Sequence, residues 1–385
     1  MPPVTRRAFL TGLLAASSAP ALLSGCIGDD DGAYGPWQGP VYDRDIRLRL
    51  VGWASLAPSS CNLQPWKVML EGDDTLHLLV DADRLHPVTD PAFRQTTISQ
   101  GTFLELLSMA AAAEGYKATI TLFPDGPYQT AREMATHPVA TVVLERDAAV
   151  LPPGLFASVR NRRTSLQPFS PRALASAERT ALLTEARSVS GVGVGYLDRG
   201  PAFERLRALA LEGLRLETAT GSVAQELARF IRLTPDEVAR HRDGRVPLSY
   251  AMGVPIRLLY GSYAFTDPES YLLRTTMARV AGQPETASAF AWMVTAENGR
   301  EDQVRVGRAY MRLDLQAAAL GVGIQPLSGT LADFAEAQAA RHDVQTLLAG
   351  PGQEVQMLFR LGRLDKADRM TPRRAAADLI VSPRR

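Results

Sequence analysis

The sequence predicts an α+β protein with two similar halves, residues 42–150 and 155–377. Three observations favour this fold class. Short alternating or apolar runs, typical of strands, lie among patterns with helical spacing. Each half also contains one long helix whose side chains are mostly small or apolar. A Pro-Pro-Gly break at residues 152–154 separates the halves, so we infer a duplicated arrangement even though the sequence does not visibly repeat.

The first 25 residues have the composition of a removable export signal. Arg6 and Arg7 precede Phe-Leu and a short apolar stretch rich in Ala, Ser and Gly, which resembles a twin-arginine signal. That stretch is too short for a permanent membrane span. Residues 23–26, Leu-Ser-Gly-Cys, resemble a lipobox, in which Cys26 would carry the lipid. The alternative is a buried N-terminal helix, which the interrupting Gly, Ser and Pro residues disfavour.

These features predict partners and a location. We expect export by the twin-arginine machinery and a lipid anchor that holds the protein at the extracytoplasmic face of the cell envelope. Residues 26–41 are predicted to form a flexible tether, because residues 29–35 are acidic, rich in Gly and without apolar periodicity. If Cys26 is acylated, Cys61 is the remaining cysteine and no intramolecular disulfide can form.

Composition excludes several classes of function. Removing residues 1–25 takes away two arginines and no acidic residue, so the net charge changes from +1 to −1. A nearly neutral chain without a basic stripe is not expected to bind nucleic acid. The five histidines are scattered, which argues against a zinc site. Neither a G-x-S-x-G elbow nor a P-loop is present.

The expected elements of the first half follow from periodicity. Two runs flank the turn Glu-Gly-Asp-Asp at residues 71–74 and predict a hairpin. Apolar side chains at helical spacing after residue 102 predict a helix that ends near Gly115. In chain order we expect a helix over 42–57, strands over 67–70 and 76–80, the helix before Gly115, and strands over 119–123 and 139–144.

The second half is predicted to be richer in helix. Val306, Tyr310 and Leu313 begin one face of a helix whose other faces are also small or apolar, so it should be buried on several sides. Gly321 ends this helix. In chain order we expect helices over 172–187 and 201–217, a mostly helical region over 218–300 broken by Pro and Gly, the helix over 306–320, an extended run from Ile324 and a strand over 355–361.

The loop at residues 58–66, Pro-Ser-Ser-Cys-Asn-Leu-Gln-Pro-Trp, is the most informative segment. It offers hydroxyl, amide and backbone groups between two prolines, a set that suits the polar edge of a flat ligand. The alternative is a capping turn with a core tryptophan, in which Asn62 bonds its own backbone. Cys61 has no charged sequence neighbour, which favours a packing role over a reactive thiol.

This loop resembles the FMN-contacting loop of the nitroreductase superfamily. Three further segments are similar to that family: Arg163-Thr-Ser-Leu-Gln-Pro-Phe, the helix and turn over 318–329, and the basic pair Arg373-Arg374 after a proline. The arginine segment follows the Asn-x-Gln-Pro-Trp loop here, whereas ordinary members have the opposite order. The permuted order resembles the fused Acg-type branch, in which one chain imitates the usual homodimer.

The resemblance implies a fold, a cofactor and a site. It implies three layers with antiparallel sheets flanked by helices, a monomeric pseudo-dimer, and FMN held under a lid, for which residues 225–260 have loop-like character. Arginine forks suit the phosphate, and amides suit the pyrimidine edge. The residues implied to bind FMN are Ser59, Ser60, Asn62, Gln64, Arg162, Arg163, Ser165, Gln167, Pro326, Ser328, Gly329, Arg373 and Arg374.

Gln167 departs from the family pattern. It stands where the family usually has Lys or Arg near the N1–O2 edge of the flavin, so a neutral amide replaces a positive charge that stabilises reduced flavin. We expect a lower flavin potential or slower reduction.

Three functions remain open. The first is an FMN oxidoreductase that passes hydride or electrons to a nitroaromatic, a quinone or a similar acceptor. NAD(P)H, the usual donor, is scarce outside the cytoplasm, so the donor is undefined. The second is a flavin-binding or flavin-sequestering protein with a lid and little turnover. The third is a scaffold that has lost flavin, which the joint presence of Asn62, Gln64 and Arg163 disfavours.

Overall fold

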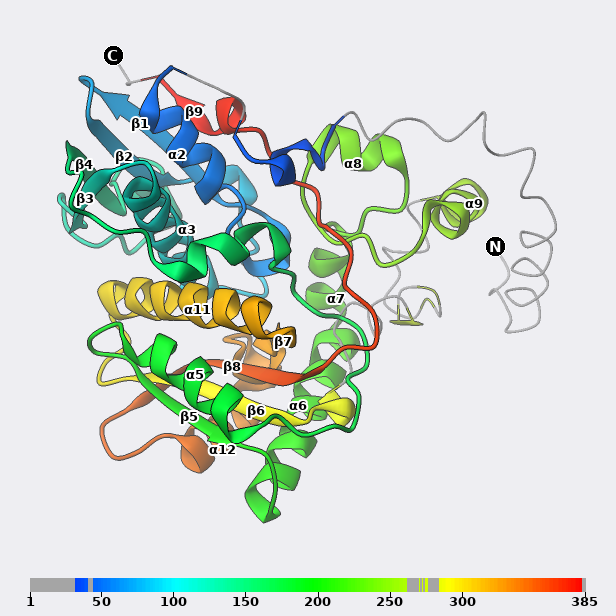
Figure 1. Cartoon of the computed structure of the whole chain (residues 1–385). Coiled ribbons are helices and arrows are strands. Elements are labelled where there is room, and N and C mark those ends of the chain that lie inside the picture. Colours follow the sequence, from blue (N-terminus) through cyan, green and yellow to red (C-terminus); the bar gives the residue numbers. More distant parts are fainter. Residues whose placement is uncertain are drawn as a thin grey trace.

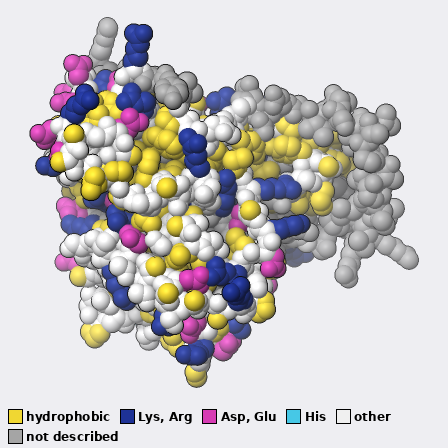
Figure 2. All heavy atoms as spheres, in the orientation of Figure 1, with side chains coloured by type: hydrophobic (Ala, Val, Ile, Leu, Met, Phe, Trp, Pro, Cys, Tyr) yellow, Lys and Arg dark blue, Asp and Glu magenta, His cyan; other side chains and the backbone are white. Residues whose placement is uncertain are grey.

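A computed structural model describes residues 32–40, 44–261, 270, 272, 274–275 and 284–382. The predicted export signal and Cys26 lie outside these residues. Within the described part of the chain, none of the helices combines the length and the apolarity needed to cross a bilayer. On the face drawn in Figure 2, basic and acidic side chains are interspersed, in agreement with the nearly neutral composition.

The first sheet belongs mainly to the first half of the chain. Its strand order is β3-β4-β2-β1-β9, and every pair is antiparallel except β1 with β9. The predicted hairpin is confirmed, with Gly72 in the turn at a φ of 51°. The strands are β1 (Trp66–Glu71), β2 (Thr75–Val80), β3 (Tyr116–Leu122), β4 (Ala140–Arg146) and β9 (Ile380–Val381).

The second sheet is fully antiparallel and has the order β5-β6-β8-β7. Its central strand β6 is buried on both faces: Ala289 and Ala291 belong to one hydrophobic cluster, and Phe290 and Val294 belong to another. The strands are β5 (Gly193–Leu197), β6 (Ala289–Thr295), β7 (Val322–Pro326) and β8 (Glu354–Arg363).

Two long helices form the layer between the sheets (Figure 1). α3 (Arg94–Ala113) and α11 (Arg300–Leu320) meet backbone to backbone, since a Cβ on Gly101 would lie 2.1 Å from the Val304 carbonyl oxygen. The same is true of Gly307, whose Cβ would lie 2.0 Å from the Ile98 oxygen. α3 packs on the first sheet and α11 on the second. The expected α+β layers with antiparallel sheets and helices are therefore present.

The remaining helices complete the two halves. α6 and α12 cover the other face of the second sheet, through Leu206 and Val344 against Phe290 and Leu358. These helices are α2 (Ile46–Ala54), α4 (Ala131–Met134), α5 (Ser176–Arg187), α6 (Pro201–Ala219), α7 (Gly221–Ala228), α8 (Pro235–His241), α9 (Tyr250–Tyr260) and α12 (Gln338–Leu348). Short 3-10 turns are η1 (Gly35–Gln38), η2 (Ser60–Asn62), η3 (Ala82–Arg84), η4 (Gly154–Asn161), η6 (Pro284–Thr286), η7 (Ser328–Leu331), η8 (Ala335–Ala337) and η9 (Ala376–Leu379).

Two segments differ from the sequence prediction. The region 218–300 was expected to be mostly helical, but β6 lies within it because six of its seven residues are buried in the sheet. Residues 32–40, the described part of the predicted tether, pack against the body of the protein. Trp37 is 3% exposed and donates from Nε1 to the Thr371 carbonyl at 2.8 Å, which fixes this segment beside the C-terminal stretch.

The C-terminal residues return to the first half. The second half was expected to end at residue 377, yet β9 pairs with β1, with Val68 opposite Ile380. The chain therefore finishes the sheet with which it began, and the segment 366–374 runs between the two halves on its way there (Figure 1).

Candidate functional site

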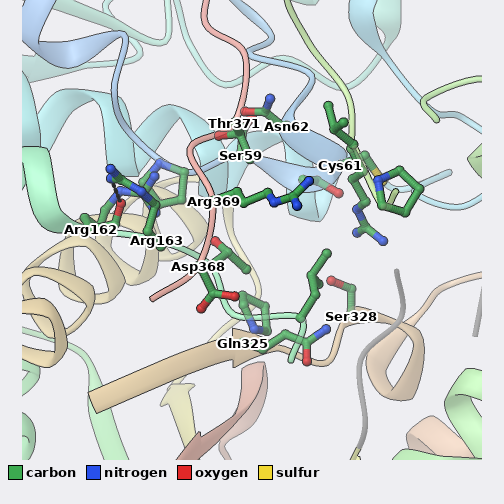
Figure 3. A pocket seen from close by; sticks show the side chains of 18 of the residues that line it. Ser59, Cys61, Asn62, Arg162, Arg163, Gln325, Ser328, Asp368, Arg369 and Thr371 are labelled. Carbon is green, nitrogen blue, oxygen red and sulfur yellow. Dashed lines mark hydrogen bonds between the residues drawn. The ribbon is translucent and has the colours of Figure 1, made fainter. Parts of the chain in front are cut away.

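A cavity of about 860 Å³ lies between the two halves, which is within the range of cofactor pockets. The loop 58–62 and α3 contribute one wall, and residues 162–168, 325–328 and 356–358 contribute another (Figure 3). Residues 245–252 and the C-terminal stretch 366–373 complete the lining. Both halves thus build one site, as the pseudo-dimer interpretation expects.

Most of the predicted site residues line this cavity. Nine of the thirteen do so: Ser59, Ser60, Asn62, Arg162, Arg163, Gln167, Pro326, Ser328 and Arg373. The other four, Gln64, Ser165, Gly329 and Arg374, are not among its lining residues. The cavity therefore brings together the four segments that are far apart in the sequence, although parts of each segment serve the fold instead.

Three arginines surround the indole ring of Trp37. The guanidinium carbons of Arg162, Arg163 and Arg373 lie 5.6, 4.3 and 5.0 Å from the ring centroid. Arg162 and Arg373 are each 2% exposed. Asp314 pairs with Arg162 at 3.1 Å between Nη1 and Oδ2. One carboxylate cannot neutralise three guanidinium groups, so the cluster has an excess of buried positive charge.

The electrostatics of the cluster reflect that excess. Burial, followed by repulsion from Arg162, lowers the pKa of Arg163 to about 10. Burial, followed by repulsion from Arg162 and Arg163, lowers the pKa of Arg373 well below its usual value. The Nε atoms of Arg162 and Arg373 and the hydroxyl of Tyr310, all within the described chain, are buried without a hydrogen-bond partner. Buried donors of this kind normally have an acceptor, so the cluster suits a dianionic group.

The loop 58–64 is held in a strained conformation. Cys61, Asn62 and Gln64 have positive φ angles of 50°, 56° and 53°, which cost roughly 1–3 kcal/mol each for residues other than glycine. Two hydrogen bonds hold the loop in this conformation. Ser59 Oγ accepts from the backbone N–H of Gln64 at 2.9 Å, and Ser60 Oγ donates to Gln95 Oε1 at 2.9 Å. Such strain is typical of functional loops.

The amide of Asn62 does not have the role expected for it. Its Nδ2 donates to the carbonyl oxygens of Gly244 and Pro372, both at 3.0 Å, and its Oδ1 accepts from Arg373. The side chain was expected to meet a pyrimidine edge, but its hydrogen-bonding groups are used to join the loop to two other segments. Asn62 therefore positions Arg373 and the cavity wall.

Gln64 and Arg374 form a structural clamp. Gln64 is fully buried. Its Nε2 donates to the backbone carbonyl of Arg242 at 2.8 Å, and its Oε1 accepts from the backbone N–H of Arg374 at 2.8 Å. The Arg374 guanidinium pairs with Asp81 at 3.1 Å and donates to the Gln64 carbonyl at 3.0 Å. Arg374 thus points away from the predicted phosphate site and anchors the C-terminal stretch to the first half.

Gln167 and its neighbours show what the sequence prediction lacked. Gln167 Nε2 donates to Asp368 Oδ1 at 3.0 Å. Lys366, Asp368 and Arg369 all line the cavity, and Figure 3 shows the Arg369 side chain extending into it. None of these three was predicted. The dense run of charges over 365–374 in an otherwise mixed sequence was the available signal.

Cys61 has the features of a packing residue. It is 7% exposed and belongs to a hydrophobic cluster with Leu227 and Leu63. Burial raises the pKa of its thiol, which disfavours the reactive thiolate. Among the residues that the structure describes, no group of His, Cys, Asp or Glu is arranged to hold a metal ion.

Comparison with known proteins reveals relatives along most of the chain. No family model matches. The chain is 25% identical over 331 residues to "Putative NAD(P)H nitroreductase Rv3131" of Mycobacterium tuberculosis, which covers 85% of this chain and 88% of that protein. "Putative NAD(P)H nitroreductase acg" of the same organism is 36% identical over 81 residues, 21% of this chain and 24% of that protein.

Solved structures give weaker similarities. The structure described as "a putative nitroreductase from anabaena variabilis" has a TM-score of 0.45 and 12% identity, and the match covers 86% of this chain and 91% of that one. The FMN-dependent nitroreductase NfnB from Mycobacterium smegmatis, in complex with NADPH, has a TM-score of 0.32 and 17% identity, over 59% and 92% of the two chains. The sequence similarity to proteins described as putative nitroreductases therefore runs through both halves of this chain.

Proposed function

We propose that this protein is an exported FMN oxidoreductase that transfers hydride or electrons to a nitroaromatic, a quinone or a similar acceptor. The arginine cluster around Trp37 carries the proposal, because its buried excess charge and unpartnered Nε atoms fit a phosphate group. The nitroreductase-like relatives support it. FMN, when bound, would supply the redox chemistry.

The protein's own residues would bind and orient the cofactor. Arg162, Arg163 and Arg373 would hold the phosphate. Ser59, Ser60, Pro326 and Ser328 line the rest of the cavity and would contact the remainder of the molecule. Asn62 would act indirectly, since it holds Arg373 in place.

The visible spectrum of the purified protein tests the proposal. We expect flavin absorbance that survives desalting, and an Arg162→Met/Arg373→Met variant that remains folded by circular dichroism but loses the flavin. The matched control is Arg199→Met/Arg205→Met, in which both side chains are mostly exposed. A folded wild-type chain that neither retains FMN nor takes it up when it is added would contradict the proposal.

A second candidate function is flavin sequestration without turnover. It is favoured by the segment 242–249. Residues 245–249 of this segment line the cavity, and residues 242 and 244 are bound to the loop 58–64 through Asn62 and Gln64. Asp243 in this segment pairs with Arg84 and Arg232. A segment held so firmly would restrict access of a nicotinamide.

Reduction kinetics distinguish the two functions. Rapid bleaching of the flavin by NADH or NADPH supports the oxidoreductase. Bleaching that is slow in wild type and at least ~10-fold faster in Asp243→Asn supports sequestration, because that variant loses the two ion pairs that hold the segment.

We also propose that the chain is exported by the twin-arginine route and anchored through Cys26. Incorporation of labelled palmitate in wild type but not in Cys26→Ser tests the anchor. Loss of export in Arg6→Lys/Arg7→Lys tests the route.

A further inference from the structure

A small side cavity adjoins the main one, and Glu217 contributes to its wall. The side cavity has a volume of about 30 Å³, which is room for a water molecule. Seven residues line both cavities: Ser60, Cys61, Gln95, Arg245, Gln325, Pro326 and Ser328. Of the two cavities, Glu217 lines only the side cavity.

Two glycines bring Glu217 to this place. A Cβ on Gly213 would lie 2.7 Å from the Thr330 backbone nitrogen, so the backbone of α6 packs directly against the backbone of η7 at this point. Glu217 follows Gly213 by one turn of α6, and a Cβ on Gly329 in η7 would lie 2.5 Å from Glu217 Cδ. The carboxyl group of Glu217 therefore rests against the Gly329 backbone, beside Ser328.

The surroundings of Glu217 favour the protonated carboxyl group. Among the described residues, the charged and titratable groups that face it are Arg245 from the segment 242–249 and the thiol of Cys61 from η2. Burial raises the pKa of Glu217 to about 7, although the charge of Arg245 acts in the opposite direction. Gln95 Nε2, on the wall shared by both cavities, is buried without a hydrogen-bond partner within the described chain. It could donate to a bridging water.

We propose that Glu217 is the proton-relaying residue of this site, which supplies a proton to the main cavity through the side cavity. This role rests on the proposed oxidoreductase function. Glu217 does not line the main cavity, so it acts through the space between them.

The proton balance defines the step. A quinone takes up two electrons and two protons to become a quinol. A reduced nicotinamide donor provides a hydride equivalent, which contains two electrons and one proton. The second proton leaves the O–H bond of Glu217 for a water molecule in the side cavity, and that water gives up one of its own protons, which forms an O–H bond on the quinone oxygen. The resulting carboxylate then takes a proton from solvent, which restores the starting state.

Three variants separate this role from a structural one. Glu217→Gln keeps the size of the side chain and removes the titration. Glu217→Asp keeps a carboxyl group and should restore part of the effect. Glu212→Gln, on the same helix with its side chain 42% exposed, is the matched control. FMN affinity is measured for all of them.

The first measurement does not depend on activity. In protein labelled with ¹³C at the glutamate carboxyls, we expect one NMR resonance that titrates near pH 7 in wild type and in Glu212→Gln. This resonance should be missing in Glu217→Gln. A Glu217 resonance that titrates below pH 5 would overturn the proposal.

The second measurement is the pH profile of quinone reduction. The wild-type rate should decrease as the pH rises through 7, whereas Glu217→Gln should be at least ~10-fold slower at pH 6 and nearly independent of pH. If Glu217→Gln binds FMN normally and keeps the wild-type profile, the relay is wrong and the oxidoreductase stands. If the wild-type chain binds no FMN, both are overturned.

Discussion

Arg163 is the least buried arginine of the Trp37 cluster, and within the described part of the chain its hydrogen bonds go to local backbone carbonyls, those of Arg160 and Arg162. Replacing it with Met should therefore disturb the fold little. A charged hydrogen bond to phosphate contributes about 1.5–3 kcal/mol, so Arg163→Met should weaken FMN binding by roughly 10- to 100-fold. Fluorescence titration measures this, with Arg199→Met as control. Unchanged affinity would place the phosphate elsewhere.

Glu217 should make stability depend on pH. Its pKa of about 7 in the folded state exceeds the ordinary value of 4.5, so the folded chain binds more protons than the unfolded chain between these values. The free energy of unfolding of wild type should fall, relative to Glu217→Gln, as the pH rises from 4.5 to 7. The fall is at most ~3 kcal/mol, and it levels off above pH 7. Urea unfolding at several pH values checks the difference, and parallel curves would contradict it.

Gln167 gives a prediction that the sequence alone would have misjudged. A lysine at this position would lie beside Asp368, whose carboxylate accepts from Gln167 Nε2, so the two charges would cancel. Gln167→Lys alone should change the flavin midpoint potential little. Gln167→Lys/Asp368→Asn should raise it by about 30 mV or more, which is ~1.4 kcal/mol for two electrons. Spectroelectrochemical titration decides, and an equal shift in both variants would rule out the role of Asp368.

At the scale of elements, the contact of α3 with α11 joins the two halves. Gly307→Ala should destabilise the protein by at least ~2 kcal/mol, because the new methyl group meets the Ile98 carbonyl and neither backbone can move easily. Gly154→Ala is the control, since nothing lies within 4 Å of its Cβ position. Thermal unfolding compares the variants. Equal stability would mean that the helices can separate at little cost.

The elements that could be predicted are those with a local signal. The hairpin, α3 and α11 have periodic sequences and clear ends, such as Gly321 at a φ of 63°. β6 was missed because both its faces are buried and its apolar run does not alternate. β5 contains Gly195, which is required because Trp292 occupies the position of a side chain there. β9 has only two residues and depends on a distant partner.

The candidate site follows the same rule. The motifs predicted which segments meet at the cavity, and nine of the thirteen predicted site residues line it. Which side chain faces the cavity depends on tertiary contacts that the sequence does not display. Gln64 and Arg374 bond each other, and Glu217 is positioned by glycines on two different elements.

At the scale of the whole molecule, the cavity needs only one chain. Both sheets enclose the α3–α11 layer, and residues of both halves of one chain line the site. We predict that light scattering of the protein without its lipid will give the mass of one chain, with FMN bound or removed. A dimer that dissociates when FMN is removed would contradict this picture.

The return of the C-terminus to the first sheet also imposes an order in time. Asn62 and Arg373, which bond each other, are 311 positions apart, and β9 follows Arg373. A growing chain therefore holds an incomplete arginine cluster until Arg373 has left the ribosome, and an incomplete first sheet until β9 has followed. Capture of an anionic ligand by this cluster would then follow synthesis of Arg373, and a chain cut before that residue would contain the loop 58–64 and the first arginine motif yet lack the third arginine.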